Sequence, residues 1–123
     1  MKKHRLFILT IMLSGCYGVE RNCNEFQTGS YSSEITIDEQ TFISSFVRSD
    51  SLQIETFDGK TDSSSVRWIN ECEVIFRTIN PKSNLEKKDI HLKILTTTKS
   101  SYTFEYSYVG ESKKQKGIAT KTN

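Results

Sequence analysis

The sequence predicts an all-β fold, an antiparallel meander of about eight strands. From Phe26 onward, apolar residues recur at every second position, and turn-forming residues interrupt this alternation roughly every eight to twelve residues. No segment carries an amphipathic pattern of three helical turns. A small barrel or curved half-barrel of lipocalin-like architecture is favoured, because closure removes exposed strand edges, with a two-sheet sandwich as the alternative.

The first half of the predicted meander contains four apolar stretches separated by turn signals. A first strand begins at residues 26–31 and includes Gly29, which is typical of a bulge or a close backbone approach. Residues 48–51 (Arg-Ser-Asp-Ser) favour a turn, and Asp58-Gly59 is a strong hairpin signal. The other apolar stretches in this half are the alternation at residues 34–38, the run at 41–47 and the alternation at 52–57.

The second half continues the same pattern. Val66 and Trp68 share one face of a strand, a tight reversal follows at Asn70-Glu71, and Pro81 prevents the next strand from continuing. A single helical turn is expected at residues 85–88. The remaining strands are expected at residues 72–77, 90–95, 102–108 and 115–122, with turns at 98–101 and at Gly110.

Residues 1–15 have the pattern of a lipoprotein signal peptide. A basic start precedes an apolar run at residues 6–13, which is shorter than the 20 or so residues that a membrane helix needs. The run ends in Leu13-Ser14-Gly15-Cys16, which resembles the lipobox of bacterial lipoproteins and implies lipidation of Cys16. The alternative is an ordinary secretory signal followed by an incidental cysteine. The expected organisation is a signal peptide at 1–15, a lipid-anchored tether at 16–25 and a single β-domain at 26–123.

This leader predicts a bacterial cell-envelope protein, bound to a membrane through its N-terminal lipid. Tyr17 rather than aspartate follows the lipobox cysteine, which by resemblance to the sorting rule of enteric bacteria favours the outer membrane. Without the leader's Lys2, Lys3 and Arg5, the chain keeps 14 basic residues against 15 acidic ones. A nearly neutral domain argues against nucleic acid as a partner.

Two cysteines remain after Cys16. Cys23 and Cys72 form an even pair in a compartment that permits disulfides, so we expect them to bond to each other. The alternative, two ligands of a metal site, has little support because no C-x-x-C occurs and His91 is the only histidine outside the leader. The sequence therefore predicts no metal site and no cofactor.

No catalytic constellation is predicted. A Ser/His/Asp site would depend wholly on His91, and neither a nucleophile elbow nor a phosphate-cradling glycine loop is present. We therefore expect a protein that is not an enzyme and has no catalytic residues.

The candidate ligand-binding residues form an aromatic stripe. Its members alternate along one side of a predicted strand, and they are Tyr102, Phe104, Tyr106 and Tyr108, with Trp68 nearby in the sheet. They are expected either to pack as ordinary core or to line a barrel interior whose phenols orient a small apolar or amphipathic ligand. In the second case Arg48 and Arg67 would be polar anchors at the mouth.

Three segments carry a family resemblance: residues 23–31, residues 48–55 and residues 66–73. On these segments the chain resembles a family of small Bacteroidota lipoproteins of uncharacterised function, whose members often carry a "DNA topoisomerase IV" label that their size and signal peptide do not support. The resemblance covers most of the domain. It implies a lipid-anchored β-domain with the two non-lipidated cysteines near each other, and it implies no activity.

Two functions follow as hypotheses. The first is a non-enzymatic β-barrel that binds a small apolar or amphipathic ligand. The second is a structural or interaction lipoprotein with a filled core that docks an envelope protein partner. The interior volume distinguishes them, because a small eight-stranded barrel is either filled by its own side chains or holds one small ligand.

Overall fold

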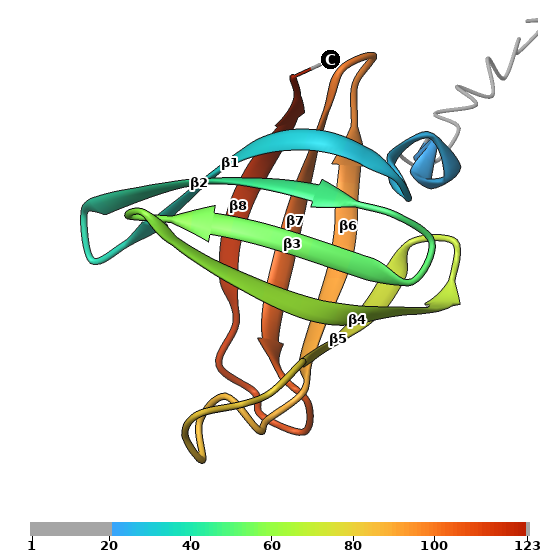
Figure 1. Ribbon diagram of the computed structural model, residues 1–123. Coiled ribbons are helices and arrows are strands. Elements are labelled where there is room, and N and C mark those ends of the chain that lie inside the picture. The colour runs from blue at the N-terminus through green and yellow to red at the C-terminus, as the bar shows by residue number, and fades with distance from the viewer. Residues whose placement is uncertain (1–20, 123) are drawn as a thin grey trace, which may run out of the picture.

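The computed structural model describes residues 21–122, which form a short 3-10 helix and eight antiparallel strands (Figure 1). Each strand pairs with the next in the sequence, so the order around the sheet is the order along the chain. The elements are η1 (Cys23–Phe26), β1 (Gly29–Ile37), β2 (Gln40–Arg48), β3 (Leu52–Phe57), β4 (Lys60–Asn70), β5 (Glu73–Thr78), β6 (Ile90–Thr97), β7 (Ser101–Tyr108) and β8 (Gln115–Lys121).

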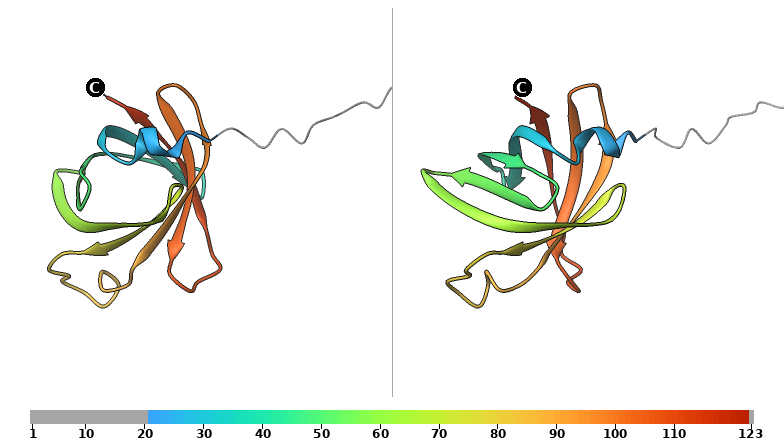
Figure 2. Two further views of the ribbon diagram at one scale, coloured as in Figure 1. Left: turned by 90° about the vertical axis from the view of Figure 1, so that its right-hand side faces the viewer. Right: turned by 45° about the vertical axis from the view of Figure 1, so that its right-hand side comes forward.

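The sheet closes into a barrel because the first and last strands pair. β1 and β8 are antiparallel neighbours in a register that runs from Tyr31 opposite Lys121 to Ile35 opposite Gly117. The two views of Figure 2 show the strands curving around one axis. The predicted antiparallel meander and small barrel are confirmed. Pairing of β1 with β8 closes the sheet, so of the forms considered the structure is the closed barrel and not the half-barrel or the two-sheet sandwich.

Two tight hairpin turns lie on the left of Figure 1, between β1 and β2 and between β3 and β4. Asp58 and Gly59 both have positive φ angles, 50° and 75°, as a two-residue turn matched to strand twist requires, so this predicted hairpin is confirmed. Asp38 and Glu39 adopt the same conformation, with φ of 50° and 66°. The sequence did not predict that turn, because neither residue is glycine or asparagine.

The long connection between β5 and β6 contains no helix. The helical turn expected at residues 85–88 is reduced to a hydrogen-bonded turn, in which Lys88 N donates to Leu85 O at 3.1 Å.

The end of the barrel opposite the β1–β2 and β3–β4 turns is closed by η1, which forms a plug of residues 23–26. Cys23 and Phe26 are each only 1% exposed, and a disulfide joins Cys23 to Cys72 in the β4–β5 turn, with Cα atoms 5.2 Å apart. The predicted disulfide is confirmed. Arg21 and Asn22 also bind the barrel, through Arg21 Nη1 to Ile94 O at 3.1 Å and Asn22 N to Thr97 Oγ1 at 3.0 Å.

Residues 21–25, which the sequence assigns to the tether, contact the barrel in the structure. They include the first three residues of η1, and Cys23 among them is bonded to Cys72. The predicted signal peptide, Cys16 and the rest of the tether lie outside the described residues. Among residues 21–122, no helix is long and apolar enough to cross a membrane.

Candidate functional site

The barrel interior holds a cavity of about 190 Å³ between the plug and the opposite end. Inward-facing side chains of every strand except β8 line it, as expected where alternate residues face the inside of a barrel. The walls are mainly aromatic and aliphatic, and polar groups enter from β1, β2, β3 and β4. The lining residues are Ser33, Ile35, Phe46, Arg48, Gln53, Glu55, Asp62, Ser64, Phe76, Ile90, Leu92, Tyr102, Phe104 and Tyr106.

A second hollow of about 300 Å³ leads from this cavity toward the β1–β2 and β3–β4 turns. It shares Ile35, Glu55, Asp62 and Tyr106 with the inner cavity. Its outer wall includes Phe42 and Phe57, whose ring centroids lie 6.1 Å apart. Because Phe57 is 43% exposed and Asp62 is also exposed, the barrel is open to solvent at this end.

Arg48 forms the polar floor of the inner cavity and is only 2% exposed. Its guanidinium donates three hydrogen bonds: Nε to Gln53 Oε1 at 2.7 Å, Nη1 to the carbonyl of Phe26 at 3.0 Å, and Nη2 to Tyr102 Oη at 3.1 Å. All three acceptors are neutral. Through the Phe26 carbonyl, Arg48 also fastens η1 to the barrel.

Four aromatic rings surround the guanidinium carbon of Arg48. The ring centroids lie between 4.9 Å, for Phe46, and 5.8 Å, for Tyr31, with Phe76 and Trp68 in between. These cation–π contacts offset part of the cost of burying the charge. The indole N–H of Trp68 is buried without a hydrogen-bond partner among the described residues.

Glu55 and Asp62 bring negative charge to the wall between the two hollows. They are direct cross-strand partners on β3 and β4, and like charges so placed repel each other. Desolvation by burial raises the pKa of Glu55, and the charge of Asp62 raises it further, while a hydrogen bond from Ser44 Oγ at 3.2 Å and the charge of Arg48 lower it. Glu55 therefore takes up a proton more readily than an ordinary glutamate.

Three phenols line or border the cavity. Burial raises the pKa of Tyr31 to about 12, a shift that Tyr102 adds to and Arg48 opposes. Burial also raises the pKa values of Tyr102 and Tyr106. All three hydroxyls therefore remain protonated at neutral pH and can donate hydrogen bonds.

The structure brings most of the predicted ligand-binding residues together. Tyr102, Phe104 and Tyr106 line the inner cavity. Tyr108 lines another hollow, of about 290 Å³, beside the β7–β8 loop, which shares Ile90 and Tyr106 with the inner cavity. Trp68 packs against Arg48 without lining the cavity.

The two predicted mouth anchors lie elsewhere. Arg48 is at the cavity floor, because its position on β2 places it near the plug. Arg67 is on the outer face, because its neighbour Val66 faces inward and side chains alternate along a strand. It lines a surface hollow with Arg77 and Asp89 and is not among the residues that line the interior cavity.

Sequence reasoning missed Gln53 and Glu55 as interior groups. Both occupy the inward-facing positions of β3, where the sequence alternates Leu-Gln-Ile-Glu-Thr-Phe. The alternation is visible in the sequence, but it does not show which of the two sets of residues faces inward. Ile54 is 40% exposed. Gln53 pairs directly with Arg48, which lines the cavity, so Gln53 and Glu55 face inward and Ile54 faces outward.

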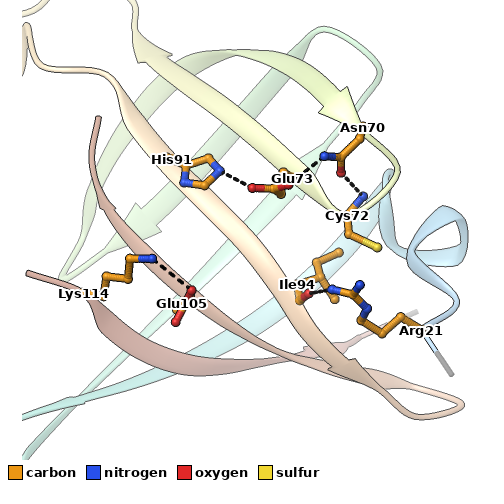
Figure 3. A network of polar contacts seen from close by, with 8 residues as sticks. All are labelled: Arg21, Asn70, Cys72, Glu73, His91, Ile94, Glu105 and Lys114. Atoms are coloured by element: carbon orange, nitrogen blue, oxygen red, sulfur yellow. Dashed lines mark hydrogen bonds and ion pairs between the residues drawn. The ribbon is translucent and has the colours of Figure 1, made fainter. Parts of the chain in front are cut away.

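A second polar cluster lies outside the barrel, near the disulfide turn (Figure 3). His91 Nε2 is 2.9 Å from Glu73 Oε1, and Asn70 donates to Glu73 Oε2 at 2.7 Å and accepts from the backbone N of Cys72. The Asn70 bond and His91 both lower the pKa of Glu73. The side chains of this cluster thus bond to one another and to the backbone of the β4–β5 turn, and their role is to fix that turn.

Within residues 21–122, no group of three or more His, Cys, Asp or Glu side chains is arranged to hold a metal ion. No family model, curated protein or solved structure gives a significant match to this chain. The barrel and its cavity are therefore the features of the molecule that bear on its function.

Proposed function

We propose that this protein is a cell-envelope lipoprotein whose barrel binds one small amphipathic ligand, without catalysis. The observation that carries this proposal is the 190 Å³ cavity, in which aromatic and aliphatic walls converge on a few polar groups. Such a combination is typical of small-molecule sites, where apolar walls supply affinity and polar groups supply orientation.

The shape of the site also supports ligand binding. The inner cavity alone is small, but it shares four lining residues with the 300 Å³ hollow at the open end. A ligand with its polar end near Arg48 would have its apolar part against Ile35 and Tyr106 and would reach solvent near Phe57.

The proposed anchor sets the orientation of this site. The described chain begins at Arg21, next to the plug, while the cavity opens at the other end. Lipidation at Cys16 would therefore hold the closed end near the membrane and leave the open end farther from it. Replacing Cys16 with serine should release the protein from the membrane fraction, and continued membrane association would contradict the anchor.

The second hypothesis, docking of an envelope protein, has less support. Every strand of the described barrel has a partner on both sides, and only short stretches at strand ends, such as residues 40–44 of β2 and 60–63 of β4, pair on one side alone, so little strand edge is free to pair with another chain. This hypothesis also expects a core filled by side chains, whereas the barrel contains an interior cavity.

A neutral fluorescent probe tests the proposal. Residues 21–122 close on themselves with their own core and disulfide, so residues 17–123, exported to an oxidising periplasm, provide a sample that needs no detergent. The apolar dye N-phenylnaphthylamine should bind this protein and increase in fluorescence. The matched variants are Ser64→Phe, which fills the cavity, and Ser65→Phe, which places the same ring on the exposed outer face one residue away.

We expect Ser64→Phe to weaken dye binding roughly ten-fold or more, and Ser65→Phe to leave it unchanged. Equal binding by both variants would place the dye outside the barrel and contradict the proposal. Native mass spectrometry of the unmodified sample adds a second readout, because a ligand retained from the periplasm would appear as extra mass that denaturation removes.

A further inference from the structure

We infer that the polar end of the ligand is a carboxylate, which binds at the cavity floor to Arg48 and Tyr102. This inference deepens the proposed binding function and rests on it. It follows from two properties of the floor, which are an unpaired buried charge and a surplus of hydrogen-bond donors.

Arg48 forms no ion pair in the described barrel, although the carboxylate of Glu55 in the same cavity wall acts on it at longer range. The guanidinium is 2% exposed, its hydrogen bonds all go to neutral oxygens, and none of the ion pairs of residues 21–122 includes it. Buried charges in proteins are ordinarily paired, because leaving water without a counter-charge is costly. The surrounding rings offset part of this cost, and an anion in the adjacent cavity would supply the missing charge.

The floor also has more donors than acceptors. A guanidinium has five N–H groups, and the three hydrogen bonds of Arg48 leave two of them without an acceptor in the described chain. The Tyr102 hydroxyl accepts from Arg48, and no described acceptor takes its own hydrogen. A carboxylate brings two acceptor oxygens and no donors, which is the complement of this set.

The acidic groups along the entry path favour a carboxylate over a doubly charged phosphate. Glu55 and Asp62 line both hollows, so a dianion would meet two carboxylates with only one guanidinium to compensate it. The groups that act on Glu55 are Ser44, Asp62, Arg48, Tyr102 and Tyr106, and it is already easier to protonate than an ordinary glutamate. A bound carboxylate would favour proton uptake at Glu55, so that affinity falls as pH rises above the range in which the ligand's own carboxyl ionises.

The decisive test compares three ligands with the same apolar chain and different ends: octanoate, octanol and octylamine. The single tryptophan, Trp68, packs 5.6 Å from the Arg48 guanidinium, so its fluorescence reports events at the floor. Displacement of N-phenylnaphthylamine gives an independent reading. For the unmodified residues 17–123, we expect octanoate to bind roughly ten-fold or more tightly than octanol, as charge-assisted hydrogen bonds predict.

The outcomes separate this inference from the proposed function. Equal binding of octanoate and octanol would keep the binding function and overturn the carboxylate. Tightest binding of octylamine would also overturn it and would assign the polar end to Glu55 and Asp62. Failure of octanoate to bind while the dye binds overturns the inference alone, and failure of all ligands and the dye overturns both.

Matched arginine variants assign the effect to a residue. Arg48→Met should abolish the preference for octanoate over octanol, while Arg67→Met, which removes an arginine from the outer face, should preserve it. An unchanged preference in folded Arg48→Met overturns the assignment.

Because Arg48 also holds the plug, Arg48→Met is a variant that can fail to fold. Glu55→Gln then provides the second test. It should strengthen octanoate binding at neutral pH and flatten its pH dependence. Unchanged affinity and pH dependence in this variant would overturn the inference.

Discussion

The two ends of the barrel differ in how their interiors are filled. At the closed end, η1 packs into the sheet, and the side chains of Cys23, Phe26, Tyr31 and Tyr102 are each 1% exposed. Their rings contact one another, with the centroids of Phe26 and Tyr102 5.3 Å apart. At the open end, Phe42 and Phe57 border a hollow and Phe57 is 43% exposed.

The closed end therefore contributes most of the stability of this small sheet, and the open end provides the space for a ligand. The closed end has the disulfide, the aromatic packing and the hydrogen bonds from Arg48 to the plug. The open end has unfilled volume and two carboxylates on neighbouring strands, features that cost stability and suit a ligand. Substitutions at the closed end should therefore affect unfolding most.

The largest expected effect is loss of the Cys23–Cys72 disulfide. Its sequence separation of 49 residues makes the chain-entropy contribution about 4 kcal/mol, so the double variant Cys23→Ser, Cys72→Ser should lose a free energy of unfolding of about that size. Urea unfolding of residues 17–123 at neutral pH measures it, with the reduced unmodified protein as the control. A loss below about 1 kcal/mol would show that the plug holds without the bond.

The next effect compares one substitution at both ends. Phe26→Ala removes a fully buried ring from the plug and should cost about 3 kcal/mol, the lower part of the usual range because a four-residue element can shift to fill space. Phe57→Ala removes a ring that is nearly half exposed and should cost less than about 1 kcal/mol. Thermal or urea unfolding measures both. Equal losses would mean that the two ends share one uniform core.

The fold was predictable because it depends on patterns that repeat. Alternation with a period of two identified β3, β5, β6 and β7 by position, and Asp58-Gly59 identified one hairpin by its conformational preference. The turn at Asp38-Glu39 was not predicted because both residues adopt positive φ angles although neither is glycine or asparagine. The plug escaped notice because four residues are too few for a helical period.

The site was predictable only in its aromatic part. Tyr102, Phe104 and Tyr106 repeat on one face, which the sequence displays. Arg48 and Arg67 look equivalent in the sequence, and only the strand register places one at the cavity floor and the other on the outer surface. The inward position of Glu55 also depends on register, since Gln53 and Glu55 alternate with apolar residues that could equally face the core.

A smaller difference between the ends should appear at high pH. Tyr31 is buried at the closed end and donates to Thr28 O at 2.6 Å, and burial raises its pKa to about 12 from the usual 10.0. The folded state holds this proton more tightly than the unfolded chain, so stability is complete below pH 10 and falls above it, by about 1 kcal/mol near pH 11. Tyr31→Phe should show a shallower decline in urea unfolding between neutral pH and about pH 11. An equally steep decline would assign the loss to the other phenols.

The smallest expected effect lies at the open end and has the opposite sign from those at the closed end. Burial and Asp62 raise the pKa of Glu55, so the folded state favours the protonated carboxyl, and the ionised form at neutral pH carries a cost that the unfolded chain does not. Glu55→Gln removes that cost and should stabilise the protein at neutral pH, by less than about 1 kcal/mol. The gain should disappear below the ordinary pKa of glutamate, where Glu55 is protonated in both states.

Urea unfolding at neutral and acidic pH measures the difference. The control is Glu105→Gln, because the carboxylate of Glu105 pairs with Lys114 on the outer face, and this variant should not be more stable. A destabilised Glu55→Gln at neutral pH would mean that the ionised carboxylate supports the fold, and the open end would then contribute to stability as the closed end does.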